Sequence, residues 1–75
     1  METATIHGHT VKYASEEHNI SVAIGYLENH LSHEEAEVFF DLAKEHGSAP
    51  FKTSDGYNFT IVHHSDYYEI IPRDN

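Results

Sequence analysis

The 75-residue sequence has no cysteine, no tryptophan and only four Lys and Arg residues. The absence of cysteine excludes disulfide scaffolds, thiolate metal sites and cysteine nucleophiles. Four cations stand against 13 Asp and Glu, so the formal net charge is −9. Direct binding to a nucleic-acid backbone, which needs Lys and Arg, is therefore not expected. No apolar run approaches the ~20 residues that span a bilayer, and we expect no membrane contact and a cytoplasmic protein.

The residues that are present are those of a small folded protein. We expect one small acidic domain over residues 1–75, because a domain usually needs roughly 50 to 200 residues. Large catalytic folds are excluded by the same length. A hydrophobic fraction of 39%, with five Tyr and four Phe, is typical of a folded chain and not of an acidic disordered tail.

The N-terminal segment, residues 3–14, predicts a β-hairpin. Thr, Ile, Val and Tyr surround a His-Gly-His string at its centre. A two-residue turn at Gly8-His9, with glycine first in a type II′ geometry, would place Ile6 opposite Val11 and keep the apolar side chains on one face. A single bent strand over the same residues is the alternative.

Two helices are predicted in the middle of the chain. Ser15, followed by two glutamates, is typical of a helix start, because a hydroxyl can cap free N–H groups and early acids complement the helix dipole. Ser32 and Glu35 form a capping box that starts the second helix, and Gly47 is suited to ending it. Because the joint is tight, we expect the helices to pack as a pair. Their core stripes would be Ile20, Ala23, Ile24, Leu27 and Leu31, and Ala36, Phe39, Phe40 and Ala43.

From Phe51 onward the helical period gives way to alternation, which indicates strands. A three-residue loop over residues 54–56 would pair Phe51 with Phe59 and keep the aromatic residues on one face. The alternative two-residue loop would pair Phe51 with Thr60 and split them.

The fold class follows from these segments. A tight turn at Ser65-Asp66 would add a last strand that sets Ile61 opposite Ile70. Together the segments predict an α+β fold in which an antiparallel sheet carries a two-helix layer on one face. The element order is ββααβββ, or βααβββ if the N-terminal segment is one bent strand.

The negative charge is concentrated in the predicted helices. Residues 15–46 carry eight acids and one base, so they hold −7 of the −9 charges. At about 100° per residue, four acids form a stripe opposite the core face of the second helix: Glu34, Glu37, Asp41 and Glu45. The stripe is either a solvated surface or a binding face for a basic protein. Val38 and Leu42 border it, and they either anchor a partner or contact the first helix.

The functional hypothesis is a non-catalytic protein-binding module. Its specific form is a small acidic inhibitor or regulator that engages a basic, nucleic-acid-binding protein surface through the helical pair, with carboxylates in place of phosphates. The partner-binding residues would be Glu34, Glu37, Val38, Asp41, Leu42 and Glu45. An enzyme is not expected, because the chain has no Gly-rich phosphate loop, no GxSxG elbow and no HExxH motif.

The first alternative is a structural or dimerising domain. Val62, Tyr67 and Ile71 would share the other face of the last strands, where they could form a homodimer or partner surface.

The second alternative is a histidine-based metal binder, since the chain has eight His. Zinc needs three or four converging ligands. His30 and His33 straddle the joint between the helices, and His63 and His64 point to opposite faces of a strand, so no metal or other cofactor is expected. A pH response is a further possibility, because histidine titrates near pH 6.5.

Overall fold

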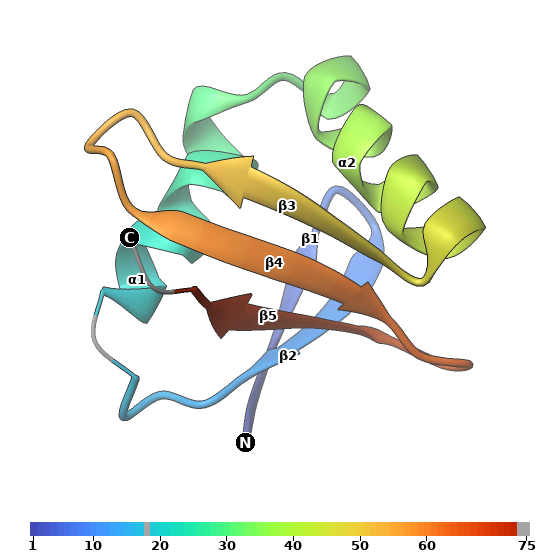
Figure 1. The fold of residues 1–75 in the computed structure, drawn as a ribbon, viewed down its shortest axis with the longest axis horizontal. Helices are drawn as coiled ribbons and strands as arrows, with labels where there is room; N and C mark the ends of the chain where they lie inside the picture. Colours follow the sequence, from blue (N-terminus) through green and yellow to red (C-terminus); the bar gives the residue numbers. More distant parts are fainter. Residues whose placement is uncertain (18, 74–75) are drawn as a thin grey trace.

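The computed structural model describes residues 1–17 and 19–73, which form five strands and three helical segments (Figure 1). Two strands come first, the helical segments follow, and three strands complete the order. The elements are β1 (Glu2–Ile6), β2 (His9–Tyr13), α1 (Ile20–Gly25), the π-helix η1 (Tyr26–His30), α2 (His33–His46), β3 (Ser48–Lys52), β4 (Asn58–His63) and β5 (Tyr68–Pro72).

The strands form one mixed sheet in the order β1-β2-β5-β4-β3. Neighbouring strands run antiparallel except β2 and β5, which are parallel, with Val11 beside Tyr68. The α+β class is confirmed, but the prediction of an antiparallel sheet is wrong. A short turn reverses the chain and makes each hairpin antiparallel. The pairing of β2 with β5 joins the N-terminal hairpin to the three C-terminal strands. The long helical connection between them allows the paired strands to run either parallel or antiparallel.

The turn of the β1–β2 hairpin differs from the expected one. His7 and Gly8 occupy it with φ of 49° and 85°, and two positive φ values are what a type I′ turn requires. Ala4 therefore lies opposite Val11, and Ile6 lies opposite His9, so the predicted turn at Gly8-His9 is wrong. The two registers differ by two residues, which leaves every side chain on its original face. The alternation of apolar residues therefore does not distinguish them.

The first helix begins later than the sequence indicates. Residues 15–17 lie in a turn in which the Glu17 N–H donates to the Ala14 carbonyl (3.1 Å), and α1 starts at Ile20 after Asn19 in a left-handed conformation. The start predicted at Ser15 is therefore wrong. The expected stripe nevertheless faces the core, with Ile20, Ala23 and Leu27 buried and Ile24 and Leu31 packed against them.

The second helix has the predicted ends. The Glu35 N–H donates to Ser32 Oγ (3.1 Å), and the Ser32 N–H donates to Glu35 Oε1 (2.9 Å). Both halves of the capping box are therefore present. At the other end, Gly47 adopts φ 92° and its N–H donates to the Ala43 carbonyl (2.7 Å).

The strands β3, β4 and β5 also have the predicted register. Phe51 pairs with Phe59, and Ile61 pairs with Ile70. The Thr53 N–H donates to the Tyr57 carbonyl (2.9 Å), which closes the three-residue loop. Strand β3 begins at Ser48, earlier than the alternation indicates.

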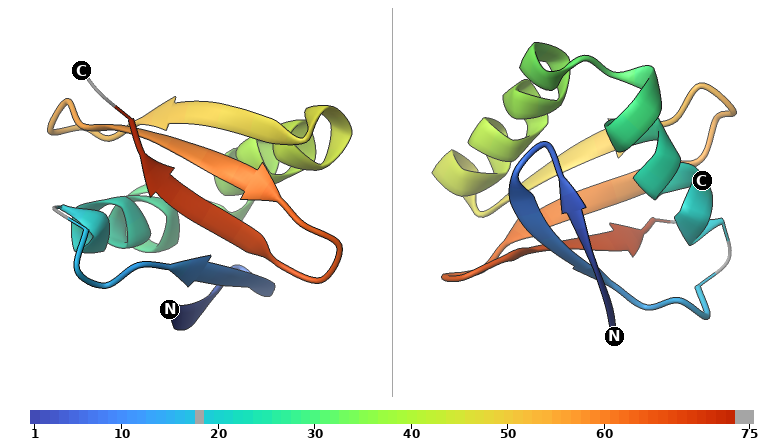
Figure 2. Two further views of the ribbon diagram at one scale, coloured as in Figure 1. Left: turned by 60° about the horizontal axis from the view of Figure 1, so that its bottom comes forward. Right: turned by 180° about the vertical axis from the view of Figure 1, so that it is seen from behind.

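All the described helices lie on one face of the sheet (Figure 2). The sheet is strongly twisted, and the tip of the β1–β2 hairpin lies between η1 and α2. His7 is hydrogen-bonded to Leu27 of η1, and His9 is hydrogen-bonded to Glu37 of α2. The helices are expected to pack as an antiparallel or steeply crossed pair, and the structure places the hairpin tip between η1 and α2. One buried cluster joins the layers: Ile6, Val11, Ile20, Ala23, Leu27, Ala36, Phe40, Ala43, Ala49, Phe51, Phe59, Ile61, Tyr68 and Ile70.

Candidate partner-binding face on α2

The packing of α2 determines which of its side chains reach solvent. Ala36, Phe40 and Ala43 are buried against the sheet, so residues on the opposite side of the helix project outward. We call these residues the outer face of α2: Glu34, Val38, Asp41, Leu42 and Glu45, all of them exposed. This face contains five of the six residues predicted to bind a partner.

Val38 and Leu42 lie one turn apart on the outer face, with 55% and 40% of their surfaces exposed. Within the described residues, the other large hydrophobic residues with comparable exposure are Met1 and Ile71. The sequence left open whether Val38 and Leu42 anchor a partner or contact the first helix. Their exposure leaves both side chains accessible to a partner. Two neighbouring apolar side chains among carboxylates differ from an ordinary solvated helix face, which carries mainly polar residues.

Glu37 does not belong to the outer face. Its side chain is 28% exposed and accepts a hydrogen bond from His9 Nε2, while His33 Nε2 lies 3.8 Å from the same carboxylate oxygen. The predicted line of four acids is therefore three outward acids plus one that contacts the β1–β2 hairpin. A helical wheel misses this difference, because Glu37 lies at the flank of the helix and only the fold brings His9 beside it.

The hairpin tip is attached to both helical segments by histidines. We call His7, His9, His33 and Glu37 the tip cluster. His7 Nε2–H donates to the Leu27 carbonyl (2.9 Å), and the His7 ring meets the His33 ring edge-on, with 5.3 Å between centroids. The Leu27 carbonyl is available because the π-helix directs the Leu31 N–H to the Tyr26 carbonyl (3.1 Å) instead.

His9 has a second role at the tip. Its ring stacks on Phe40, with 4.3 Å between centroids, and meets Tyr68 edge-on at 5.3 Å. In the sequence, the only sign of the tip cluster is the His-x-His spacing of His7 and His9, and this spacing does not indicate which residues the two rings contact. The tip cluster is held by hydrogen bonds and ring contacts. Within residues 1–17 and 19–73, no group of three or more His, Asp or Glu is arranged to hold a metal ion.

The charges of the outer face are not neutralised within the described chain. Every ion pair among the described residues joins a histidine to a glutamate: His9 and His33 to Glu37, and His64 to Glu69 at 2.9 Å. Glu34, Asp41 and Glu45 thus have no cationic partner in that part of the molecule. Of these three acids, Asp41 also acts on the sheet: burial raises the pKa of Tyr68, and the charges of Glu37 and Asp41 raise it further.

The three residues of the alternative surface, Val62, Tyr67 and Ile71, lie on the sheet face away from the helices. Ile71 is 41% exposed. Tyr67 is partly covered, because Lys12 Nζ lies 4.6 Å from its ring centroid and His64 stacks on it at 4.6 Å. The apolar area of this face is therefore reduced by two polar side chains.

Comparison with models of protein families, with curated proteins and with solved structures finds no match to this chain. None of the helices in the described residues has the length and apolar character that crossing a membrane demands.

Proposed function

We propose that the protein is a non-catalytic protein-binding module whose outer face of α2 engages a basic protein surface. The observation that carries the proposal is the pair Val38 and Leu42, exposed one turn apart among three carboxylates that have no cationic partner in the described chain. Protein interfaces commonly combine apolar anchors with surrounding polar contacts. Unpaired carboxylates around the anchors select a cationic partner.

The finer form of the proposal is an inhibitor or regulator that mimics nucleic acid. Along the axis of α2, Glu34 and Asp41 are about 10 Å apart and Asp41 and Glu45 about 6 Å apart, at 1.5 Å per residue. These separations correspond to about three and about two steps of a nucleic-acid strand, whose charges are 3.4 Å apart along the axis. A surface that receives phosphates could therefore receive this face, and DNA would compete for it.

The test uses proteins that bind heparin resin, presented to the immobilised chain at about 0.05 M and about 0.5 M salt. We expect the immobilised chain to retain a protein at low salt. High salt or added DNA should release that protein. Charge reversal of Glu34, Asp41 and Glu45 to Lys should abolish its retention. Reversal of Glu2, Glu16 and Glu17, which are exposed elsewhere, changes the net charge equally and should have a much smaller effect.

The double variant Val38→Ser with Leu42→Ser separates anchoring from charge. It keeps every carboxylate, so a partner that merely senses negative charge would still bind. We expect retention to fall at least tenfold. Equal retention by the wild type, by the Lys variant of the outer face and by this Ser variant would refute the proposal.

A further inference from the structure

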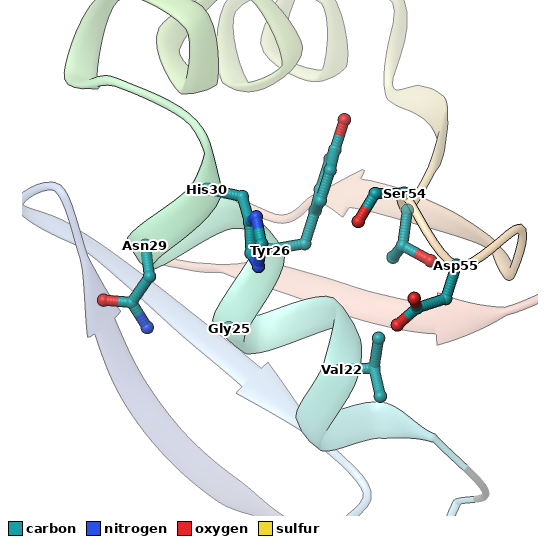
Figure 3. A pocket seen from close by; sticks show the side chains of 8 residues that line it. Val22, Gly25, Tyr26, Asn29, His30, Ser54 and Asp55 are labelled. Atoms are coloured by element: carbon teal, nitrogen blue, oxygen red, sulfur yellow. The ribbon is translucent and has the colours of Figure 1, made fainter.

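A pocket of about 180 Å³ lies away from the outer face of α2 (Figure 3). It opens between the α1–η1 segment and the loop that joins β3 to β4. The helical wall includes Val22, Gly25, Tyr26 and His30, and the loop contributes Thr53, Ser54 and Asp55. Figure 3 shows the Asp55 and Ser54 side chains facing Tyr26 and Val22 across the opening.

The loop side of the pocket is held in place by its own hydrogen bonds. Thr53 is 4% exposed, its Oγ1 accepts from the Tyr57 N–H (3.2 Å), and its carbonyl accepts from the Gly56 N–H (3.0 Å). Gly56 has φ 93°, a conformation that glycine adopts without strain. Asp55 is therefore the exposed middle residue of a short loop that its own hydrogen bonds hold in place.

The helical side is equally well supported. The Tyr26 ring lies almost parallel to Phe51 of the core, with an interplanar angle of 8°, and stacks with His30 at 6.0 Å between centroids. Tyr26 and His30 are the first and last residues of the π-helix. The two rings therefore lie together at the pocket wall, and the Tyr26 ring is also stacked on Phe51.

Gly25 has no role in the fold that requires glycine. It is helical, with φ −62°, and a Cβ at this position would meet no atom within 4 Å. Alanine would favour the helix more than glycine does. Gly25 is one of the residues that line the pocket, and the space beside it is open.

The charge of the pocket is that of Asp55. Among the described residues, no hydrogen-bond donor or cationic group is paired with its carboxylate. The surrounding wall offers aliphatic and aromatic surface from Val22, Tyr26 and His30, and polar groups from Asn29 and Ser54. A carboxylate beside such a wall suits a cationic head on a short carbon stem, whereas an anion would be repelled by Asp55 and by the net charge of −9.

We propose that this pocket binds a small organic cation, with an ammonium or guanidinium group paired to Asp55 and its stem against Val22 and Tyr26. The volume of about 180 Å³ is below the ~300 Å³ at which pockets for drug-sized molecules begin. The ligand is therefore no larger than a long amino-acid side chain. It is either a free amine or the Lys or Arg side chain of a peptide. This proposal does not depend on the outer face of α2.

The test is a titration of the full chain followed by the shifts of its backbone amide signals. Agmatine represents the free cation, acetyl-Gly-Arg-Gly-amide represents a side chain in a peptide, and butyrate is the anionic control. We expect saturable shifts confined to residues 22–30 and 53–56 with at least one of the two cations, and no saturable shift with butyrate. The tighter of the two cations identifies the source.

Two variants and a matched control decide the assignment. Asp55→Asn keeps the shape of the loop side chain and should weaken the cation at least tenfold, and Gly25→Leu should block the pocket with a comparable loss. Asp66→Asn removes one charge from the other exposed loop and should leave the affinity unchanged. Equal affinities of Asp55→Asn and Asp66→Asn would overturn the proposal, and so would shifts centred on α2. The Lys variant of the outer face should still bind the cation, so the two proposals can fail separately.

Discussion

The two sides of α2 use the same residue type for different purposes. Glu37, at the flank, accepts a hydrogen bond from His9 and lies within 3.8 Å of His33. Glu34, Asp41 and Glu45 on the outer face have no cationic partner in the described chain. The carboxylates of one helix are therefore divided between contact with the β1–β2 hairpin and exposure to solvent. The division depends on where the β1–β2 hairpin docks, and not on the helix itself.

The largest contrast between the sides is expected for apolar truncations. Phe40 is fully buried and contacts the rings of His9 and Tyr68, so Phe40→Ala should cost about 3–5 kcal/mol of unfolding free energy. Leu42 is 40% exposed, and Leu42→Ala should change stability by no more than about 0.5 kcal/mol. Urea denaturation measures both. A large loss for Leu42→Ala would mean that the outer face is covered by the protein itself.

The next contrast concerns the carboxylates. A double-mutant cycle with His9→Phe, which keeps a ring on Phe40, and Glu37→Gln should give a coupling free energy of about 1 kcal/mol. Glu34→Gln with His9→Phe is the matched control on the outer face, and it should show no measurable coupling. Denaturation at neutral pH provides both values. Equal coupling free energies in the two cycles would mean that His9 does not distinguish Glu37, at the flank of α2, from Glu34 on the outer face.

The capping box adds a pH-dependent difference at the start of α2. Hydrogen bonds from the Ser32 N–H and hydroxyl hold the pKa of Glu35 below its ordinary value of 4.5. A lowered pKa in the folded state gives a contribution that is present above the ordinary value and is lost as the pH falls through the folded value. The stability difference between wild type and Glu35→Ala should therefore be constant above about pH 5 and shrink on acidification. A difference that stays the same at low pH would show that the charge of Glu35 does not contribute to it.

The smallest expected effect is alkaline and involves Tyr68, whose pKa is raised above 10.0 by burial and by Glu37 and Asp41. A raised pKa gives a contribution that is complete below the ordinary value and is lost as the pH rises through the folded value. Wild type should thus lose more stability above about pH 10 than Tyr68→Phe. Asp41→Asn should reduce the loss. An identical alkaline profile for wild type and Tyr68→Phe would show that the pKa of Tyr68 is not raised in the folded state.

Local patterns predicted most parts of the fold whose hydrogen bonds close within a few residues, although the turn of the β1–β2 hairpin was predicted one residue too late. The capping box spans three residues from Ser32 to Glu35, and the Thr53–Tyr57 loop spans four. The capping box and the loop each depend only on the types of the few residues that form them. The first helix was less predictable, because its stripe of Ile20, Ala23 and Leu27 was correct while the start at Ser15 was not. A weak cap signal at Ser15 does not outweigh the turn that forms there.

The amino-acid sequence by itself determined α2 and its two ends, the register of β3, β4 and β5, and the concentration of negative charge in the helical part of the chain. Only the tertiary structure decided that β2 pairs with β5 in parallel. It also decided that His9 reaches Glu37 across 28 residues and that Glu34, Asp41 and Glu45 stay free of cations in the described chain. The physical reason is that caps and tight turns are satisfied by neighbours in the chain, whereas these contacts depend on how the hairpin, the helices and the last strand dock around one core.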